Sequence, residues 1–188
     1  LENWNLPKSK LKETAPITLL SSNISIPTAT THILADADTQ RLLHAHDRIV
    51  RTALTRNKGH EIRHTGDGIM ASFRQVFNSI EAAIQMQQEA LLHNQQNPTL
   101  PLHLKIGIDT GEPTTKEDDV FAHVSQISKQ IVNKAHAGKI YVSENIRGIC
   151  KGRGQNFSSR GNYEIKGYYG SIHLYEGHWG SETAIRAN

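Results

Sequence analysis

Apolar residues recur along the chain with two alternating periods, and these periods predict the order of its strands and helices. Short segments typical of strands are 17–26, 60–65, 69–73, 102–111, 139–143, 162–167 and 171–177. Apolar residues three and four positions apart mark one buried face of a helix, and they fall within 42–54, 76–91 and 124–135. A short helix is expected between Ser143 and Cys150. Hairpins mixed with helices indicate an α/β (α+β) fold, a mixed β-sheet flanked by helices.

The predicted elements fit a single domain. At 188 residues the chain is long enough to bury one substantial core. We expect that domain to span residues 17–177. Residues 1–16 are polar and lysine-rich and are interpreted as a linker or an arm leading into the domain, and residues 178–188 as a C-terminal tail.

Charge and composition argue against several classes of function. The formal net charge is only +3 and aromatic residues make up 6% of the chain, so a nucleic-acid partner is not expected. No apolar run reaches the length of a membrane span, and a membrane contact is expected only through a region upstream. Cys150 is the single cysteine and has no partner for an internal disulfide. We therefore expect a cytoplasmic protein, or the cytosolic part of a larger, membrane-tethered one.

The histidines do not form a metal-binding pattern. His44 and His46 lie two positions apart on a predicted helix, so their side chains point to different faces and make a poor metal pair. The others are scattered, and we interpret them as surface or hydrogen-bonded core residues.

Residues 63–73, RHTGDGIMASF, join two predicted strands through Gly66, Asp67 and Gly68. A glycine on each side of an aspartate permits positive φ and fits a two-residue hairpin turn. That interpretation needs no function. The other interpretation is that the hairpin presents the Asp67 carboxylate for chemistry, and the other motifs of the chain bear on the choice.

Several spaced motifs occur in a specific order: GHEIRHTGDGIMASF, LKIGIDTGE, EDDVFAHVSQISKQ, AGKIYVS, YEIKG and IHLYE. In this order they resemble the class III adenylyl/guanylyl cyclase homology domain over residues 17–177. The resemblance implies a mixed sheet with a ferredoxin-like core, and a dimer whose active sites are shared between subunits. It also implies a reaction in which the 3′ hydroxyl of a nucleoside triphosphate attacks the α-phosphate and releases pyrophosphate, assisted by two metal ions.

The resemblance assigns the metal site to two positions of this sequence. Asp67 matches one of the family's two metal-binding aspartates. Asn23 stands where the other is expected, and a neutral amide does not bridge two cations as a carboxylate does. We therefore expect Mg²⁺ or Mn²⁺ to bind weakly, or not at all, without nucleotide.

The resemblance also assigns the substrate and transition-state positions. Arg63 and Asp119 match the residues that read the base, an arrangement that favours ATP over GTP, and Lys166 matches a lysine that contacts the triphosphate. Gln126 and Gln130 stand in place of the Asn and Arg that stabilise the transition state. Lys129 lies about 100° around the helix from Gln130 and is not expected to take over the role of the arginine.

These substitutions predict a cyclase-like domain with impaired or lost catalysis and a regulatory or nucleotide-binding role in signalling. The alternative is an active adenylyl cyclase that converts ATP to cyclic AMP and pyrophosphate with altered metal ligation. Under both hypotheses the expected partners are a nucleoside triphosphate and a second cyclase domain, in a homodimer or a heterodimer.

Overall fold

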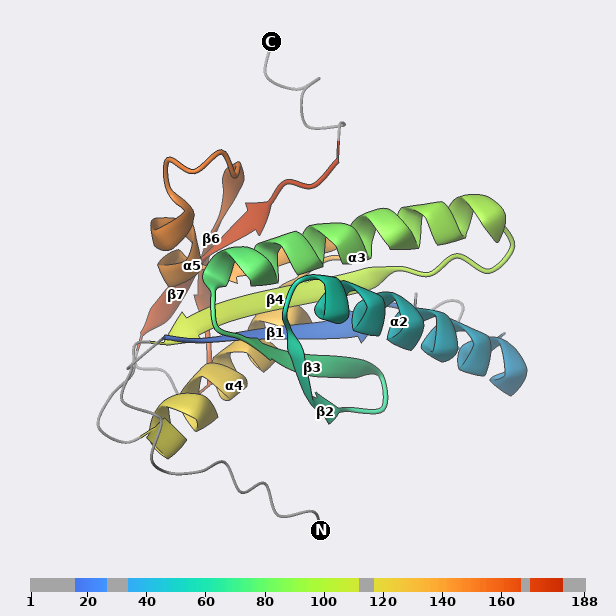
Figure 1. Ribbon diagram of the computed structural model, residues 1–188, viewed down its shortest axis with the longest axis horizontal. Helices are drawn as coiled ribbons and strands as arrows, with labels where there is room; N and C mark the ends of the chain where they lie inside the picture. The colour runs from blue at the N-terminus through green and yellow to red at the C-terminus, as the bar shows by residue number, and fades with distance from the viewer. Residues whose placement is uncertain (1–15, 27–33, 112–116, 167–169, 181–188) are drawn as a thin grey trace.

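A computed structural model describes residues 16–26, 34–111, 117–166 and 170–180, although the side chains of 117–120 lie outside this description. Within these ranges the chain forms one seven-stranded mixed sheet and four helices (Figure 1). The expected mixed sheet flanked by helices is confirmed.

The strands are β1 (Ile17–Ile24), β2 (His60–His64), β3 (Gly68–Phe73), β4 (Leu104–Gly111), β5 (Lys139–Ser143), β6 (Phe157–Glu164) and β7 (Ser171–Gly177). Their order in the sheet is β2-β3-β1-β4-β5-β7-β6. β1 lies between β3 and β4 and is antiparallel to both, whereas β4 and β5 are parallel. Because β4 and β5 are parallel, a crossover connects them, and in this chain the crossover contains a helix.

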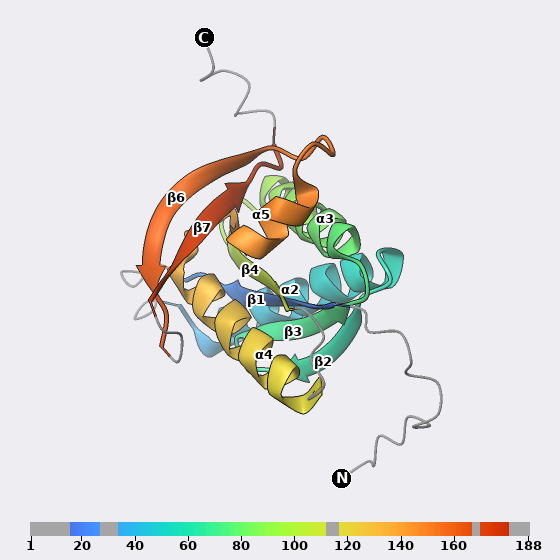
Figure 2. The ribbon, with the colours of Figure 1, turned by 90° about the vertical axis from the view of Figure 1, so that its left-hand side faces the viewer.

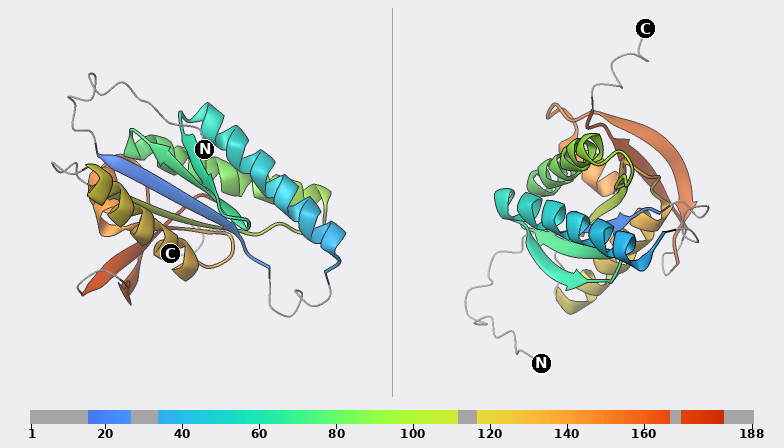
Figure 3. Two further views of the ribbon diagram at one scale, coloured as in Figure 1. Left: turned by 90° about the horizontal axis from the view of Figure 1, so that it is seen from below. Right: turned by 90° about the vertical axis from the view of Figure 1, so that its right-hand side faces the viewer.

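The helices are α2 (Asp36–Arg56), α3 (Val76–Gln96), α4 (Glu117–Lys134) and α5 (Glu144–Cys150). α2, α3 and α5 cover one face of the sheet, and α4, which connects β4 to β5, covers the other (Figures 2 and 3). None of the described helices combines the length and the apolar character that crossing a membrane requires.

The alternation of side chains along β1 divides its residues between these two layers. Leu20 packs in the core beneath α2 and α3, whereas Leu19 packs with Met70 and Val124 on the α4 side. Ser22 accordingly faces α2, and Ser21 faces α4. Asn23, two positions after Ser21, points to the α4 side as well.

Most predicted elements are confirmed, and two details were wrong. The strand expected at 162–167 runs from Phe157 to Glu164, because its pairing with β7 extends back to Gly177. Leu91 was placed on the buried face of its helix, but it is 49% exposed, whereas its neighbour Ala90 is buried, so Leu91 lies outside the buried face of α3.

Gly107 in β4 allows α4 to approach the sheet. A Cβ at this position would lie 2.4 Å from the backbone nitrogen of Val132, a backbone atom that has no room to move aside. We predict that Gly107→Ala destabilises the fold by about 1–3 kcal/mol, lowering the melting temperature in circular dichroism by about 2–12 °C for a chain of this length. Gly148→Ala is the matched control, because Gly148 lies in α5 with open space around it and should be neutral or slightly stabilising. Equal melting temperatures for Gly107→Ala and the wild type would contradict this packing.

Candidate functional site

The hairpin between β2 and β3 places Asp67 beside the end of β1. Thr65 donates its backbone N–H to the carbonyl of Gly68 at 2.8 Å, which closes a two-residue turn of Gly66 and Asp67. Gly66 has φ of 90° whereas Asp67 does not have positive φ, the combination of a type II′ turn. Gly68 pairs with Asn23 across the sheet, and a Cβ on Gly68 would lie 1.9 Å from the Ser22 carbonyl oxygen. Only glycine therefore lets the hairpin approach β1 this closely.

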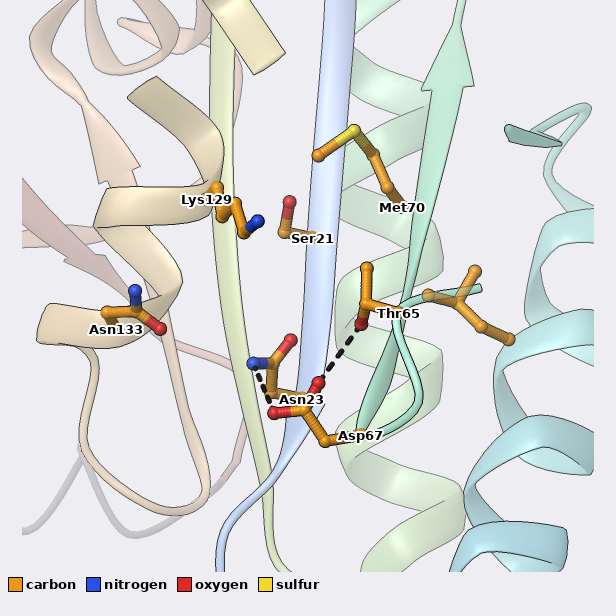
Figure 4. Close-up of a pocket in the computed structure, with 8 residues that line it drawn as sticks. Ser21, Asn23, Thr65, Asp67, Met70, Lys129 and Asn133 are labelled. Carbon is orange, nitrogen blue, oxygen red and sulfur yellow. Dashed lines mark hydrogen bonds between the residues drawn. The ribbon is translucent and has the colours of Figure 1, made fainter. Parts of the chain in front are cut away.

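Both carboxylate oxygens of Asp67 accept a hydrogen bond from a neighbouring side chain (Figure 4). Asn23 donates Nδ2–H to Oδ2 at 3.3 Å, and Thr65 donates Oγ1–H to Oδ1 at 3.1 Å. The carboxylate is thus held by uncharged donors. The resemblance predicts that Asn23 and Asp67 share one site, and the structure places their side chains in contact.

A pocket of about 190 Å³ opens beside this pair. Its polar lining comes from Ser21 and Asn23 on β1, Thr65 and Asp67 of the hairpin, and Lys129 and Asn133 on α4. Figure 4 shows the Lys129 ammonium directed toward Ser21, and Asn133 below it on the same side. One anionic and one cationic side chain therefore line the same pocket of a single chain.

The position of Lys129 over β1 is fixed by the residue before it. Ser128 and Ser21 share a hydrogen bond of 3.1 Å between two buried hydroxyls, which joins α4 to β1. Lys129 and Asn133 are one helical turn apart and project from the same face of α4. Sequence reasoning gave neither residue a role. Their i, i+4 spacing was the available signal, but the strand they face depends on contacts about a hundred residues away in sequence.

Gln126, Gln130 and Lys166 form a second group. Gln130 donates Nε2–H to the Lys166 carbonyl at 2.7 Å and accepts the Lys166 backbone N–H on Oε1, also at 2.7 Å. Gln126 donates to the same carbonyl at 2.9 Å. Both glutamines therefore fasten the segment after β6 to α4, while the Lys166 side chain is exposed.

The remaining predicted residues lie apart from these groups. Arg63 is exposed on β2, at the edge of the sheet, and does not line the pocket. Asp119 lies in the first turn of α4, and its side chain lies outside the described residues. The predicted roles of Arg63, Asp119, Lys166, Gln126 and Gln130 stay predictions.

A chain of hydrogen bonds that sequence reasoning missed connects β1, α2 and β2 behind the pocket. Ser22 Oγ lies 3.0 Å from Nε2 of His46, and Nδ1 of His46 lies 2.9 Å from Oδ1 of Asp47. Asp47 Oδ2 in turn lies 2.9 Å from Nε2 of His64. Because His64 is on the strand that leads to the Asp67 turn, this chain supports the hairpin from the α2 side. His46 is buried and His44 is exposed, which confirms that these two histidines do not share a face.

Two residues in this series of hydrogen bonds, His46 and Asp47, have pKa values below their ordinary values. Burial lowers the pKa of His46, and the neighbouring Asp47 offsets only part of that effect. Partial burial alone would raise the pKa of Asp47, but the hydrogen bonds from His46 and His64 outweigh it and hold that pKa below its usual value. The folded protein thus favours a neutral His46 beside an ionised Asp47.

Comparison with solved structures defines the class of fold. The chain superposes with a TM-score of 0.72 on an adenylate/guanylate cyclase/hydrolase of Silicibacter pomeroyi, at 18% identity, covering 86% of this chain and 95% of that one. It superposes equally well, with a TM-score of 0.72 and 18% identity, on the adenylyl cyclase CyaB of P. aeruginosa, covering 89% of this chain and 96% of that one. The fold is that of the class III nucleotidyl cyclases.

Comparison of sequences defines the family. The family model for the adenylate and guanylate cyclase catalytic domain matches residues 9–178. The chain belongs to this family. It is 25% identical over 121 residues to "Putative adenylate cyclase 3" of Rhizobium meliloti, a match that covers 63% of this chain and 21% of that protein. The chain spans about half or less of the length of the curated relatives it matches.

The residues present do not fit the pair of divalent ions that the family implies. Within the described ranges, no three His, Cys, Asp or Glu residues are grouped as metal ligands. The carboxylate at Asp67 already accepts two hydrogen bonds, and the ammonium of Lys129 lines the same pocket. Where the resemblance implies two carboxylates and a formal charge of −2, Asn23 and Asp67 together carry −1, and Lys129 brings the sum for the pocket to zero.

The lowered pKa of His46 predicts how stability depends on pH. Its folded-state pKa lies below the ordinary value of 6.5, so the unfolded chain takes up a proton first as pH falls. The contribution of His46 is therefore complete above about pH 6.5 and is lost below it, with a slope of up to about 1.4 kcal/mol per pH unit. Asp47 reduces the stability further only below about pH 4. Its pKa is lowered in the folded protein, so its contribution is lost only as pH falls below the ordinary pKa of a carboxyl.

Urea unfolding at pH 7.5 and 5.5 checks this prediction. The loss of stability between the two pH values should be smaller in His46→Gln than in the wild type. His44→Gln is the control, because it removes an exposed histidine from the same helix and should leave the difference unchanged. An equal loss in His46→Gln and the wild type would show that His46 does not set the pH dependence.

Proposed function

We propose that this chain is a class III cyclase domain that has lost most of its catalytic power and serves as a nucleotide-binding, regulatory module in signalling. The observation that carries the proposal is the contact between Gln130 and the backbone of Lys166. Both polar atoms of the Gln130 amide are used in that contact. The side chain that the resemblance assigns to the transition-state arginine position therefore fastens the segment after β6 to α4.

The consequence for catalysis follows from charge and reach. An arginine offers a fixed fork of donors and a permanent positive charge to a phosphate, whereas glutamine is neutral. To reach the α-phosphate, Gln130 would first have to release two hydrogen bonds to Lys166. Loss of a phosphate-facing arginine costs roughly 10³–10⁵ in rate, and loss of one preorganised donor, as at Gln126, roughly 10²–10³.

The proposed ligand is a nucleoside triphosphate. A guanylate cyclase domain from Catenaria anguillulae, solved in complex with GTP, superposes on this chain with a TM-score of 0.66, and the likeness supports nucleotide binding here. We propose ATP as the preferred nucleotide, because Arg63 and Asp119 suit the donor and acceptor pattern of adenine. Guanine would require an acceptor for its N1–H.

We also propose that the domain pairs with a second cyclase domain, identical or different. The similar guanylyl cyclase domain from Blastocladiella emersonii is described as dimeric, whereas the similar cyclases from Trypanosoma brucei are described in a monomeric state. Because this chain is substituted at positions from both halves of a shared site, its homodimer would contain two damaged sites. The module is proposed to act in the cytosol.

Light scattering tests the assembly. The purified domain should show a mass near twice 21.0 kDa at high concentration, because the exposed edge strand β2 and α4 lie where the family's shared interface is expected. A monomer at every concentration would rule out the homodimer and leave only pairing with a different chain.

Cyclic nucleotide production tests the loss of catalysis. We predict that the wild-type domain makes cyclic AMP or cyclic GMP at least roughly a thousandfold more slowly than an intact relative, with Mg²⁺ or Mn²⁺, because of the donor and arginine losses. The triple revertant Asn23→Asp, Gln126→Asn, Gln130→Arg should gain activity. Adding Asp67→Ala to that revertant should remove the gain, since it deletes the remaining carboxylate.

Robust cyclic AMP formation by the wild-type homodimer, abolished by Asp67→Ala, would overturn the proposal. It would establish the alternative, an active adenylyl cyclase with altered metal ligation.

A further inference from the structure

The pocket beside Asp67 contains a cation of its own. Lys129 extends from α4 into the space lined by Asn23 and Asp67 (Figure 4). Within the described part of the chain, its ammonium takes part in no hydrogen bond or ion pair. Its three N–H donors are therefore available to a ligand.

The other polar groups of the pocket also favour an acceptor ligand. The side-chain amide of Asn133 makes no hydrogen bond within the described residues and lies one helical turn from Lys129. Asp67, the single carboxylate that lines the pocket, has a donor already on each of its oxygens. A ligand thus meets free donors on the α4 side and an occupied acceptor on the hairpin side.

We propose that Lys129 is the resident cation of this site, and that the pocket binds a phosphate group of a nucleotide without a divalent metal ion. The inference rests on the proposed nucleotide-binding function and names the group that this site recognises. A phosphate offers several acceptor oxygens and at least one negative charge, and lysine binds phosphate as a point charge. Asn133 supplies a second, neutral donor.

The size of the pocket limits which part of the nucleotide it holds. Sites that enclose a whole drug-sized ligand measure about 300–1,000 Å³, whereas this pocket measures about 190 Å³. It is therefore assigned to phosphate oxygens, with the base and sugar lying outside it. Inorganic phosphate and tripolyphosphate share this chemistry with ATP and should compete for the same pocket.

Lys129 also opposes a metal ion at the same place. A divalent cation near Asp67 would be repelled by the ammonium, so the lysine and the metal exclude each other electrostatically. This predicts opposite effects for the two charged residues. Removing Lys129 should weaken phosphate binding, whereas removing the negative charge of Asp67 should strengthen it.

Isothermal titration calorimetry with ATP, tripolyphosphate and adenosine, each in EDTA and then in Mg²⁺, tests the proposal. In EDTA, Lys129→Met should weaken ATP and tripolyphosphate binding roughly tenfold or more, as for the loss of one charge-assisted hydrogen bond. Asp67→Asn should bind both ligands at least as tightly as the wild type. Lys134→Met is the control, because Lys134 is exposed on the same helix and does not line the pocket, and it should change affinity by less than about twofold.

The titrations with adenosine and with Mg²⁺ distinguish the reasons for which phosphate binding could fail. Adenosine binding should be the same in Lys129→Met and the wild type, so a loss there would indicate misfolding, which circular dichroism also detects. Binding of ATP that requires Mg²⁺ and is abolished in Asp67→Asn would overturn the proposal that Lys129 is the resident cation. It would leave the proposed nucleotide-binding function intact. If ATP binds neither in EDTA nor in Mg²⁺, the nucleotide-binding function fails, and the inference fails with it.

Discussion

The alternation of side chains along β1 decides which of its residues lie in the core and which line the pocket. β1 is paired on both sides, with β3 and β4, so its register is fixed and each residue is committed to one face. Ser22 is directed to His46 beneath α2, while Asn23 is directed to the pocket beneath α4. A shift of one residue would exchange these roles and place Asn23 in the apolar core.

Two glycines, Gly68 and Gly107, allow close backbone contacts that bring the pocket residues together. Gly68 lets the hairpin lie against β1, which places Asp67 within hydrogen-bonding distance of Asn23. Gly107 lets α4 lie against β4, and the bond between Ser21 and Ser128 then sets the height of Lys129 along the strand. The pocket is therefore the meeting point of three segments that are far apart in sequence.

Much of this fold could be predicted from the sequence, because strands and helices differ in the period of their apolar residues. The same local signals predicted the turn at Asp67, where glycine is required on both sides. They could not predict that Gln130 would fasten the backbone of Lys166, or that Lys129 would face Asn23. Those contacts depend on how α4 is rotated over the sheet, which is set by packing among distant segments. Leu91 was misplaced because it lies at the margin of the buried face of α3, and apolar periodicity does not set the width of that face.

The resemblance implies that a negative charge is missing at Asn23 and a positive charge at Gln130. The pocket contains a positive charge of its own at Lys129. We propose that this internal cation takes the place of a bound metal pair, while Gln126 and Gln130 hold the backbone of Lys166.

The most direct test is the anomalous scattering of crystals grown with Mn²⁺ and ATP. We expect no pair of manganese peaks between Asn23 and Asp67, and we expect the Lys129 ammonium to lie against a phosphate oxygen. Two strong peaks about 3.5–4 Å apart, the spacing of two-metal sites, with Asp67 as their ligand would contradict it.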